Sequence, residues 1–149
     1  MSIWRNRCTL EELNAQSIDT MLEPLGIVFT EIGEDFLRAD MPVDARTRQT
    51  LGILHGGASV ALAETVGSVG ANLCVDTAHY YCVGQDINAN HVRAARDGWV
   101  TGLGRPLHIG GRSHVWAIDI TNAAGQLVCV SRLTMAVLER ARPDRVRSP

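Results

Sequence analysis

The stretch GGASVALAETVGSVGANLC, from Gly56 to Cys74, constrains the fold more than any other part of the sequence. Its alanines and leucines, its scarcity of β-branched residues and its length favour a helix over a strand. A helix that is apolar on nearly every side must be enclosed by other parts of the chain. An antiparallel sheet can wrap such a helix, so the sequence predicts a long central helix surrounded by strands.

Segments rich in β-forming residues flank this helix, two before it and four after it. They are Gly26–Gly33, Asp35–Val43, Tyr81–His91, Trp99–Ile109, Ser113–Asn122 and Gln126–Glu139. The junction at Gly33–Asp35 suits a hairpin, residues 44–50 read as a polar loop, and Ala123–Gly125 predicts a tight turn. The order of these elements indicates an α+β fold.

The two ends of the chain differ from this central pattern. Thr9 and Glu12 have the spacing of a capping box, which predicts a short helix ending near Ala15. Residues 140–149 are rich in Arg and Pro and poor in apolar residues, so we expect a disordered tail there. Residues 1–139 are then expected to form a single domain.

Composition and charge exclude several kinds of partner. The chain has 149 residues, of which 46% are hydrophobic, and its net charge is −2. A net charge this small and negative provides no electrostatic field that would attract nucleic acid or an anionic membrane. No leader sequence and no spanning segment is recognisable, which predicts a cytoplasmic protein. Cys8, Cys74, Cys82 and Cys129 are widely spaced, which indicates free thiols and no metal site.

Glu64 is the only charged residue in the apolar stretch. Glu64, Ser68 and Asn72 recur at every fourth position, so they form one polar stripe on the helix. This stripe could be a strip of solvent exposure, but such strips usually carry Lys and Glu pairs. A lone acid among small residues indicates a cleft instead. Burial raises the pKa of a carboxyl group, which suits a general base or a nucleophile.

The start of the same helix offers a complementary group. His55, Gly56 and Gly57 lie where the helix begins, and the first turn of a helix has unpaired N–H groups at the positive end of its dipole. Glycine there permits close approach by a ligand. Such donors could hold a carbonyl oxygen as it becomes negative, as in an oxyanion hole.

The pattern Q-x-x-G-x-x-H-G-G-A-x-x-x-L-A-E, from Gln49 to Glu64, resembles the signature of hotdog-fold acyl-CoA thioesterases in the 4-hydroxybenzoyl-CoA thioesterase branch. It is most similar to the group of 1,4-dihydroxy-2-naphthoyl-CoA hydrolases and enterobactin proofreading thioesterases. The resemblance extends over the ranges 41–49, 87–96, 106–116 and 131–137. It implies the hotdog fold, a homodimer with active sites shared at the subunit interface, and pairing of dimers into a homotetramer.

The resemblance also implies roles for individual residues. Glu64 would be the nucleophile or general base, while Gln49, His55 and Gly56 would come from the partner subunit. Gly56 N–H and Gln49 would polarise the thioester carbonyl, and His55 and Ser68 would position water or the leaving group. No metal and no cofactor is implied, apart from the CoA of the substrate.

CoA recognition is assigned by the same resemblance to a second set of residues. These are Gly84, His91, Val92, Arg93, Ala94, His108, Ile109, Gly110, Gly111, Arg112 and Ser113. Arg93 and Arg112 are the natural partners of phosphate groups. His79 and His114 are expected to be ordinary surface residues.

The sequence departs from the family pattern after Gln49. Close relatives have Pro and then an aromatic residue where this chain has Thr50 and Leu51, so a stacking surface is missing from the loop that helps form the acyl pocket. The expected function is hydrolysis of an aromatic or related acyl-CoA thioester. Alternatives are hydrolysis of a carrier-protein thioester, a hotdog-fold dehydratase, and a non-catalytic acyl-CoA binding module.

Overall fold

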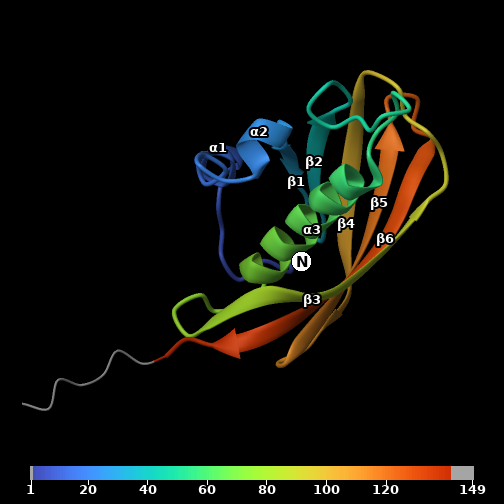
Figure 1. Cartoon of the computed structure of the whole chain (residues 1–149). Coiled ribbons are helices and arrows are strands. Elements are labelled where there is room, and N and C mark those ends of the chain that lie inside the picture. The colour runs from blue at the N-terminus through green and yellow to red at the C-terminus, as the bar shows by residue number, and fades with distance from the viewer. Residues whose placement is uncertain (1, 142–149) are drawn as a thin grey trace, which may run out of the picture.

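Figure 1 shows the computed structural model of the chain, which describes residues 2–141. A six-stranded antiparallel sheet in the order β1-β2-β4-β5-β6-β3 wraps around the long helix α3. The strands are β1 (Val28–Ile32), β2 (Leu37–Pro42), β3 (Tyr80–His91), β4 (Trp99–Ile109), β5 (Ser113–Asn122) and β6 (Leu127–Glu139), and the helices are α1 (Leu10–Ala15), α2 (Leu22–Leu25) and α3 (Gly56–Leu73). The predicted α+β hotdog fold is confirmed.

Most predicted boundaries agree with the structure to within two residues. The short helix α2 was not predicted, because four residues give no periodicity. It ends at Gly26, whose φ of 69° is left-handed, so β1 begins at Val28 rather than at Gly26. The capping box is confirmed, since the Thr9 side chain accepts from Glu12 N–H and the Glu12 side chain accepts from Thr9 N–H.

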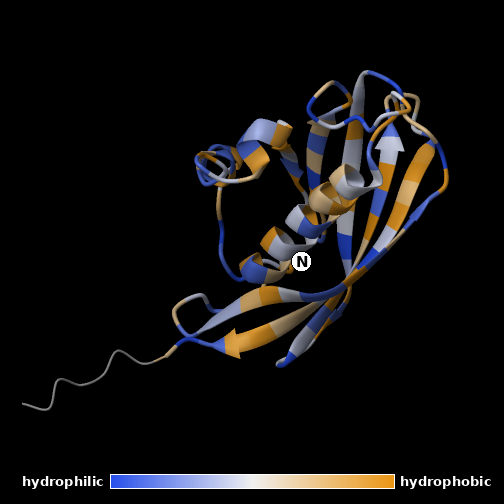
Figure 2. Ribbon diagram, viewed as in Figure 1, coloured by the Kyte–Doolittle hydropathy of each residue, from blue (hydrophilic) through white to orange (hydrophobic). Residues whose placement is uncertain are grey.

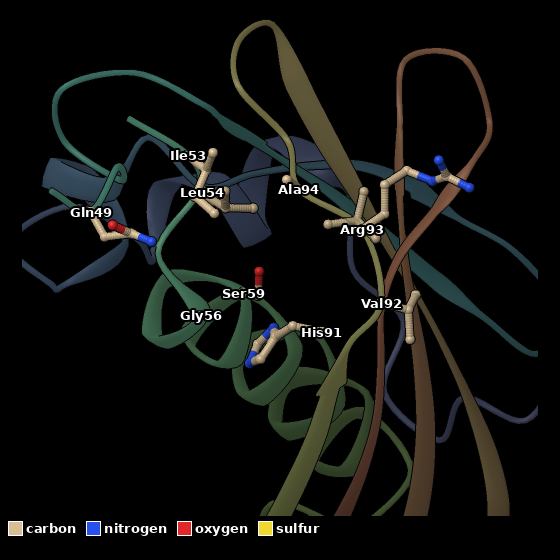
Figure 3. A pocket seen from close by; sticks show the side chains of 10 residues that line it. Gln49, Ile53, Leu54, Gly56, Ser59, His91, Val92, Arg93 and Ala94 are labelled. Atoms are coloured by element: carbon tan, nitrogen blue, oxygen red, sulfur yellow. The ribbon is translucent and has the colours of Figure 1, made fainter. Parts of the chain in front are cut away.

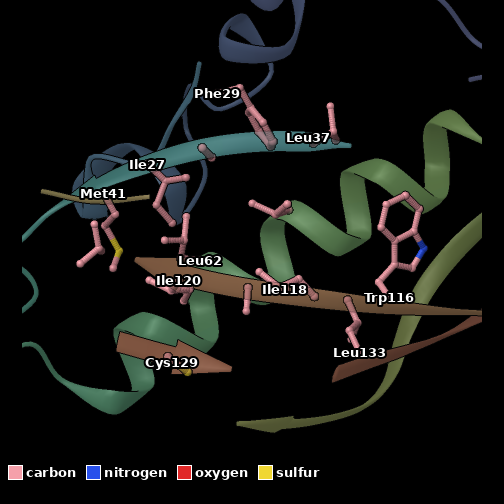
Figure 4. Close-up of a cluster of buried hydrophobic side chains, with 14 of the residues drawn as sticks. Ile27, Phe29, Leu37, Met41, Leu62, Trp116, Ile118, Ile120, Cys129 and Leu133 are labelled. Carbon is pink, nitrogen blue, oxygen red and sulfur yellow. The ribbon is translucent and has the colours of Figure 1, made fainter. Parts of the chain in front are cut away.

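The hydrophobic core lies between α3 and the concave face of the sheet (Figure 4). Trp116, Ile118 and Ile120 of β5 alternate along the strand and are fully buried. Burial of each such side chain stabilises the fold by about 1.5–3 kcal/mol. Gly70 of α3 lies against the Trp116 ring, where a Cβ would come within 2.6 Å of it, so only glycine allows the helix this close to the sheet.

His114 is buried, and the expectation that it is a surface residue is wrong. It is only 1% exposed, because it lies two positions before Trp116 and therefore points to the same inner face of β5. Its Nδ1 has no hydrogen-bond partner among residues 2–141. Burial lowers the pKa of His114, as does the nearby His108. His79 is exposed, as expected.

The N-terminal segment covers part of the other side of α3. The Asn6 side chain donates to the carbonyl oxygens of Asn72 (3.2 Å) and Val75 (2.6 Å), so it caps the C-terminal end of α3. Trp4 stacks on Trp116 with 6.2 Å between ring centroids. Polar and apolar bands alternate along α3 (Figure 2), and its polar stripe is half-buried beneath this incomplete cover.

Strand β3 is an edge strand, and the Asn72 side chain of α3 bonds to its backbone. Asn72 donates to the Cys82 carbonyl (3.0 Å) and accepts from the Cys82 N–H (2.9 Å). β3 pairs only with β6, and its register shifts between Gly84 and Asp86. The outer edge of β3 therefore pairs with no strand of the described chain.

The remaining predictions concern the C-terminal tail, the cysteines and membrane-spanning helices. Arg140 is ordered, because its N–H donates to the His79 carbonyl and its guanidinium to the Thr77 carbonyl, both at 2.8 Å. Residues 142–149 of the predicted tail lie outside the described residues. All four cysteines are free, as predicted. No helix within residues 2–141 combines the length and the apolar character needed to cross a bilayer.

Candidate functional site

Two hollows lie on different sides of α3, and the predicted catalytic residues are divided between them. The first hollow, of about 350 Å³, is lined by Gln49, Ile53, Leu54, Gly56, Ser59, His91, Val92, Arg93, Ala94 and Val128 (Figure 3). The second, of about 560 Å³, is lined by Met21, Leu22, Gly57, Val60, Ala61, Glu64, Thr65, Ser68 and Val69. At about 100° per residue, Gly57, Glu64 and Ser68 share one side of the helix. Gly56 and Ser59 face another side.

The first turn of α3 presents donors to the first hollow. His55 is the N-cap, and its Nδ1 accepts a hydrogen bond from Gly57 N–H at 2.8 Å. Neutral His55 must then carry its proton on Nε2, so it can donate a hydrogen bond outward. Gly56 N–H has no partner among residues 2–141. The N-terminus of α3 thus offers a free backbone donor at the positive end of the helix.

Gln49 is held by its own loop in a fixed orientation. Its Oε1 accepts from Leu51 N–H, and its backbone N–H donates to the Ile53 carbonyl at 2.8 Å. Leu54 N–H donates to the Ala95 carbonyl at 2.7 Å, which ties this loop to the segment after β3. No residue of the described chain accepts from the Gln49 side-chain amide, so both of its N–H groups are available to a ligand.

His91 and Arg93 come to the same place from the end of β3. The His91 ring lies against Gly56, where a Cβ would be 2.8 Å from Nε2, so glycine leaves room for the imidazole. The backbone N–H groups of Val92 and Arg93 both donate to the Val128 carbonyl, at 2.9 and 3.3 Å. The structure thus brings Gln49 and Gly56 together with the predicted CoA-binding residues 91–94 (Figure 3).

Glu64 lies in the second hollow as a half-buried carboxylate. Burial raises the pKa of Glu64, and the Ser68 hydroxyl, 3.5 Å from Oε1, lowers it in part. No ion pair within residues 2–141 involves Glu64. The carboxylate lies over Gly84 of β3, where a Cβ would overlap Oε1 and lie 3.1 Å from Cδ. An unneutralised carboxylate of raised pKa is a competent base.

The described residues provide neither a reactive thiolate nor a cluster of metal-ligating side chains. Burial raises the pKa of all four cysteine thiols, that of Cys74 to about 12, so none of them is a thiolate at neutral pH. No group of three or more His, Cys, Asp or Glu side chains in residues 2–141 is placed to hold a metal ion. Glu64 is therefore the strongest candidate for a reacting side chain.

The predicted CoA-binding residues 108–113 form the hairpin between β4 and β5, away from the first hollow. The register aligns Gly84 with Met135, Met135 with His114, and His114 with Ile109. Gly84 and this hairpin therefore lie at one level of the sheet, while His91 lies about 20 Å further along β3 at about 3.3 Å per residue. Within one chain, the two groups of predicted CoA-binding residues are separated.

The sequence reasoning missed Ser59, Met21 and Leu22. Ser59 follows Gly56 by three positions, so helical periodicity alone would have placed both on one side of α3. Met21 and Leu22 line the Glu64 hollow from the loop before α2 and from α2 itself, which no periodicity revealed.

Comparison with known proteins identifies the family of the chain. Residues 51–129 match the model of the thioesterase superfamily. The chain is 53% identical over 136 residues to the 1,4-dihydroxy-2-naphthoyl-CoA hydrolase of Escherichia coli, covering 91% of this chain and 99% of the relative. It is 51% identical over 137 residues to the proofreading thioesterase EntH of Cronobacter sakazakii, covering 91% and 98%. The crystal structure of a thioesterase variant from Pseudomonas aeruginosa superposes with a TM-score of 0.92 at 48% identity, covering 93% and 100%.

Proposed function

This chain belongs to the thioesterase superfamily, and from that premise we propose that it hydrolyses an aromatic or related acyl-CoA to the free acid and CoA. The observation that carries the proposal is the half-buried Glu64 carboxylate, whose pKa burial raises and which no cation within residues 2–141 neutralises. The named substrate of the Escherichia coli relative supports the aromatic acyl group.

The proposed chemistry uses the free donors at the start of α3. Glu64 attacks the thioester carbonyl carbon or takes a proton from the water that attacks it. As the nucleophile adds to the carbonyl carbon, negative charge develops on the carbonyl oxygen, and Gly56 N–H and the Gln49 amide would stabilise it. The carbonyl then re-forms while the carbon–sulfur bond breaks and CoA leaves as the thiolate. If Glu64 is the nucleophile, water then hydrolyses the resulting anhydride and releases the free acid. His55, with its proton on Nε2, and Ser68 would position the water or the leaving thiolate.

These groups lie in different hollows of one chain, so we propose that the site is completed by a second copy. The unpaired outer edge of β3 supports this proposal, because a long free edge readily pairs with another strand. A two-fold dimer formed along β3 would bring Glu64 of each chain toward Gln49 and Gly56 of the other. The two separated groups of CoA-binding residues could then contact one substrate.

Thiol release from benzoyl-CoA, followed with a thiol reagent, tests the reaction. Glu64→Ala and Glu64→Gln should fold normally and lose at least about 10²-fold in kcat, as expected for loss of a base or nucleophile. Full activity in either variant would contradict the assigned role.

Subunit mixing tests the shared site. Glu64→Ala and Gln49→Ala/His55→Ala proteins are each expected to be inactive. After subunit exchange, mixed dimers should regain part of the activity, because one of their two sites would be intact. A monomer in analytical ultracentrifugation, or no rescue after proven exchange, would contradict the proposal.

A further inference from the structure

Ser59 is a buried residue whose hydroxyl points into the first hollow and bonds to no group of residues 2–141. It is only 1% exposed. Figure 3 shows its oxygen directed into the space between Leu54, Ala94 and His91. The Ser59 N–H donates to the His55 carbonyl at 3.2 Å, but no group of residues 2–141 bonds to its Oγ.

An unpartnered hydroxyl at this position is unfavourable for the helix itself. Serine favours a helix less than alanine, and a buried polar group without a hydrogen bond destabilises a protein. Thr65, another buried hydroxyl of α3, shows the usual solution, because it donates to the Ala61 carbonyl at 2.7 Å. Ser59 makes no such bond, so its hydroxyl remains open to a group that enters the hollow.

The neighbours of Ser59 indicate a neutral polar partner. Leu54, Ala94 and Val128 give this hollow an apolar lining, while the charged Arg93 is exposed. A hydroxyl can donate to a carbonyl oxygen and accept from an N–H, so it suits an amide group. Phosphate groups would instead select the guanidinium of Arg93.

We propose that Ser59 Oγ hydrogen-bonds an amide of the pantetheine arm of the acyl-CoA. This inference rests on the proposed function, in which Gly56 and Gln49 hold the thioester carbonyl and Arg93 meets a phosphate. The pantetheine arm joins these two ends of the substrate, and it has two amides separated by methylene groups. Ser59 is thus a binding residue for the arm and contacts neither reacting atom.

The test compares Ser59→Ala with wild type on benzoyl-CoA, benzoyl-pantetheine, the benzoyl thioester of N-acetylcysteamine, and S-ethyl thiobenzoate, which has no amide. Alanine removes one oxygen atom and favours a helix, so the variant should fold. The matched control is Ser131→Ala, which removes another buried hydroxyl, 3.7 Å from the Cys129 sulfur and outside both hollows.

Ser59→Ala should lower kcat/KM for benzoyl-CoA and benzoyl-pantetheine by about threefold to tenfold, mainly through KM, as expected for one neutral hydrogen bond. S-ethyl thiobenzoate should be hydrolysed equally by wild type and Ser59→Ala, and Ser131→Ala should match wild type on all four substrates. If Ser59→Ala also lowers kcat/KM for the N-acetylcysteamine thioester, Ser59 bonds the amide nearer the sulfur. If kcat/KM for this substrate is unchanged, Ser59 bonds the amide farther from the sulfur.

Two results would overturn this inference alone while wild type remains active. One is a decrease in kcat/KM of Ser59→Ala on S-ethyl thiobenzoate equal to its decrease on benzoyl-CoA, which would mean that Ser59 acts on the reaction or on folding. The other is no loss on any amide-containing substrate. A wild-type protein that hydrolyses none of the four thioesters would instead overturn the proposed function.

Discussion

Gly84→Ala tests whether β3 sets the position of the Glu64 carboxylate, the proposed base or nucleophile. A Cβ on Gly84 would overlap Oε1 of Glu64, so the carboxylate cannot stay where it is. Because that atom is the far end of a flexible side chain, the carboxylate can move aside and the fold should survive. The required movement is about 1 Å, and a misplacement of that size can lower the rate about 10²-fold.

The assay is kcat for benzoyl-CoA, measured beside thermal unfolding. Gly84→Ala should lose about 10²-fold in kcat with little change in Tm. Gly70→Ala is the matched control, because its Cβ would press on the Trp116 ring at 2.6 Å, far from the carboxylate. That variant should lower Tm while its folded fraction keeps its kcat.

A double substitution sharpens the test. Glu64→Asp has a shorter side chain and should be poor by itself, but it would relieve the overlap created by Gly84→Ala. The loss in the double variant should therefore be smaller than the product of the two single losses. Unchanged kcat in a folded Gly84→Ala protein would refute the reasoning.

Three further outcomes follow from other contacts. Activity should fall as pH drops through the raised pKa of Glu64, because the proposed mechanism needs the carboxylate form. Ser68→Ala should move this fall to higher pH in a profile of kcat/KM against pH, because the Ser68 hydroxyl lowers the pKa of Glu64. Arg112→Ala should raise KM for acyl-CoA about tenfold but leave acyl-pantetheine kinetics unchanged, if the guanidinium meets a phosphate. Asn72→Leu should lower the free energy of unfolding in urea by about 1–3 kcal/mol, because it leaves the Cys82 N–H and carbonyl without their partner.

The sequence predicted the fold where a single periodicity decides the structure. The apolar run from Gly56 predicted α3, and the β-rich segment Ser113–Asn122 predicted β5. His114 lies two positions before the buried Trp116 and shares its face of β5, yet the residue type suggested the surface. The pattern was the better guide, because the direction of a side chain in a strand depends on its position and not on its polarity.

The division of the site was implied by the family resemblance but not by the spacing of the residues, because it depends on two geometric facts that spacing alone leaves open. One is the helical phase of α3, which turns Gly56 and Glu64 to different sides. The other is the register of β3 against β6, with its shift after Gly84, which sets that residue beneath the carboxylate. The motif from Gln49 to Glu64 is therefore one continuous segment of the sequence, whereas its residues line two hollows in space.

This division bears on the proposed role of Glu64 as a base. Within residues 2–141, no cation neutralises the carboxylate, and the free Gly56 N–H lies in the other hollow. A free donor at the positive end of a helix stabilises a nearby carboxylate and lowers its pKa. Because Gly56 lies in the other hollow, it does not offset the rise in the pKa of Glu64 that burial causes. In the proposed dimer, this donor would come from the partner chain and contact the substrate carbonyl oxygen. It would then stabilise the charge that develops on that oxygen in the transition state.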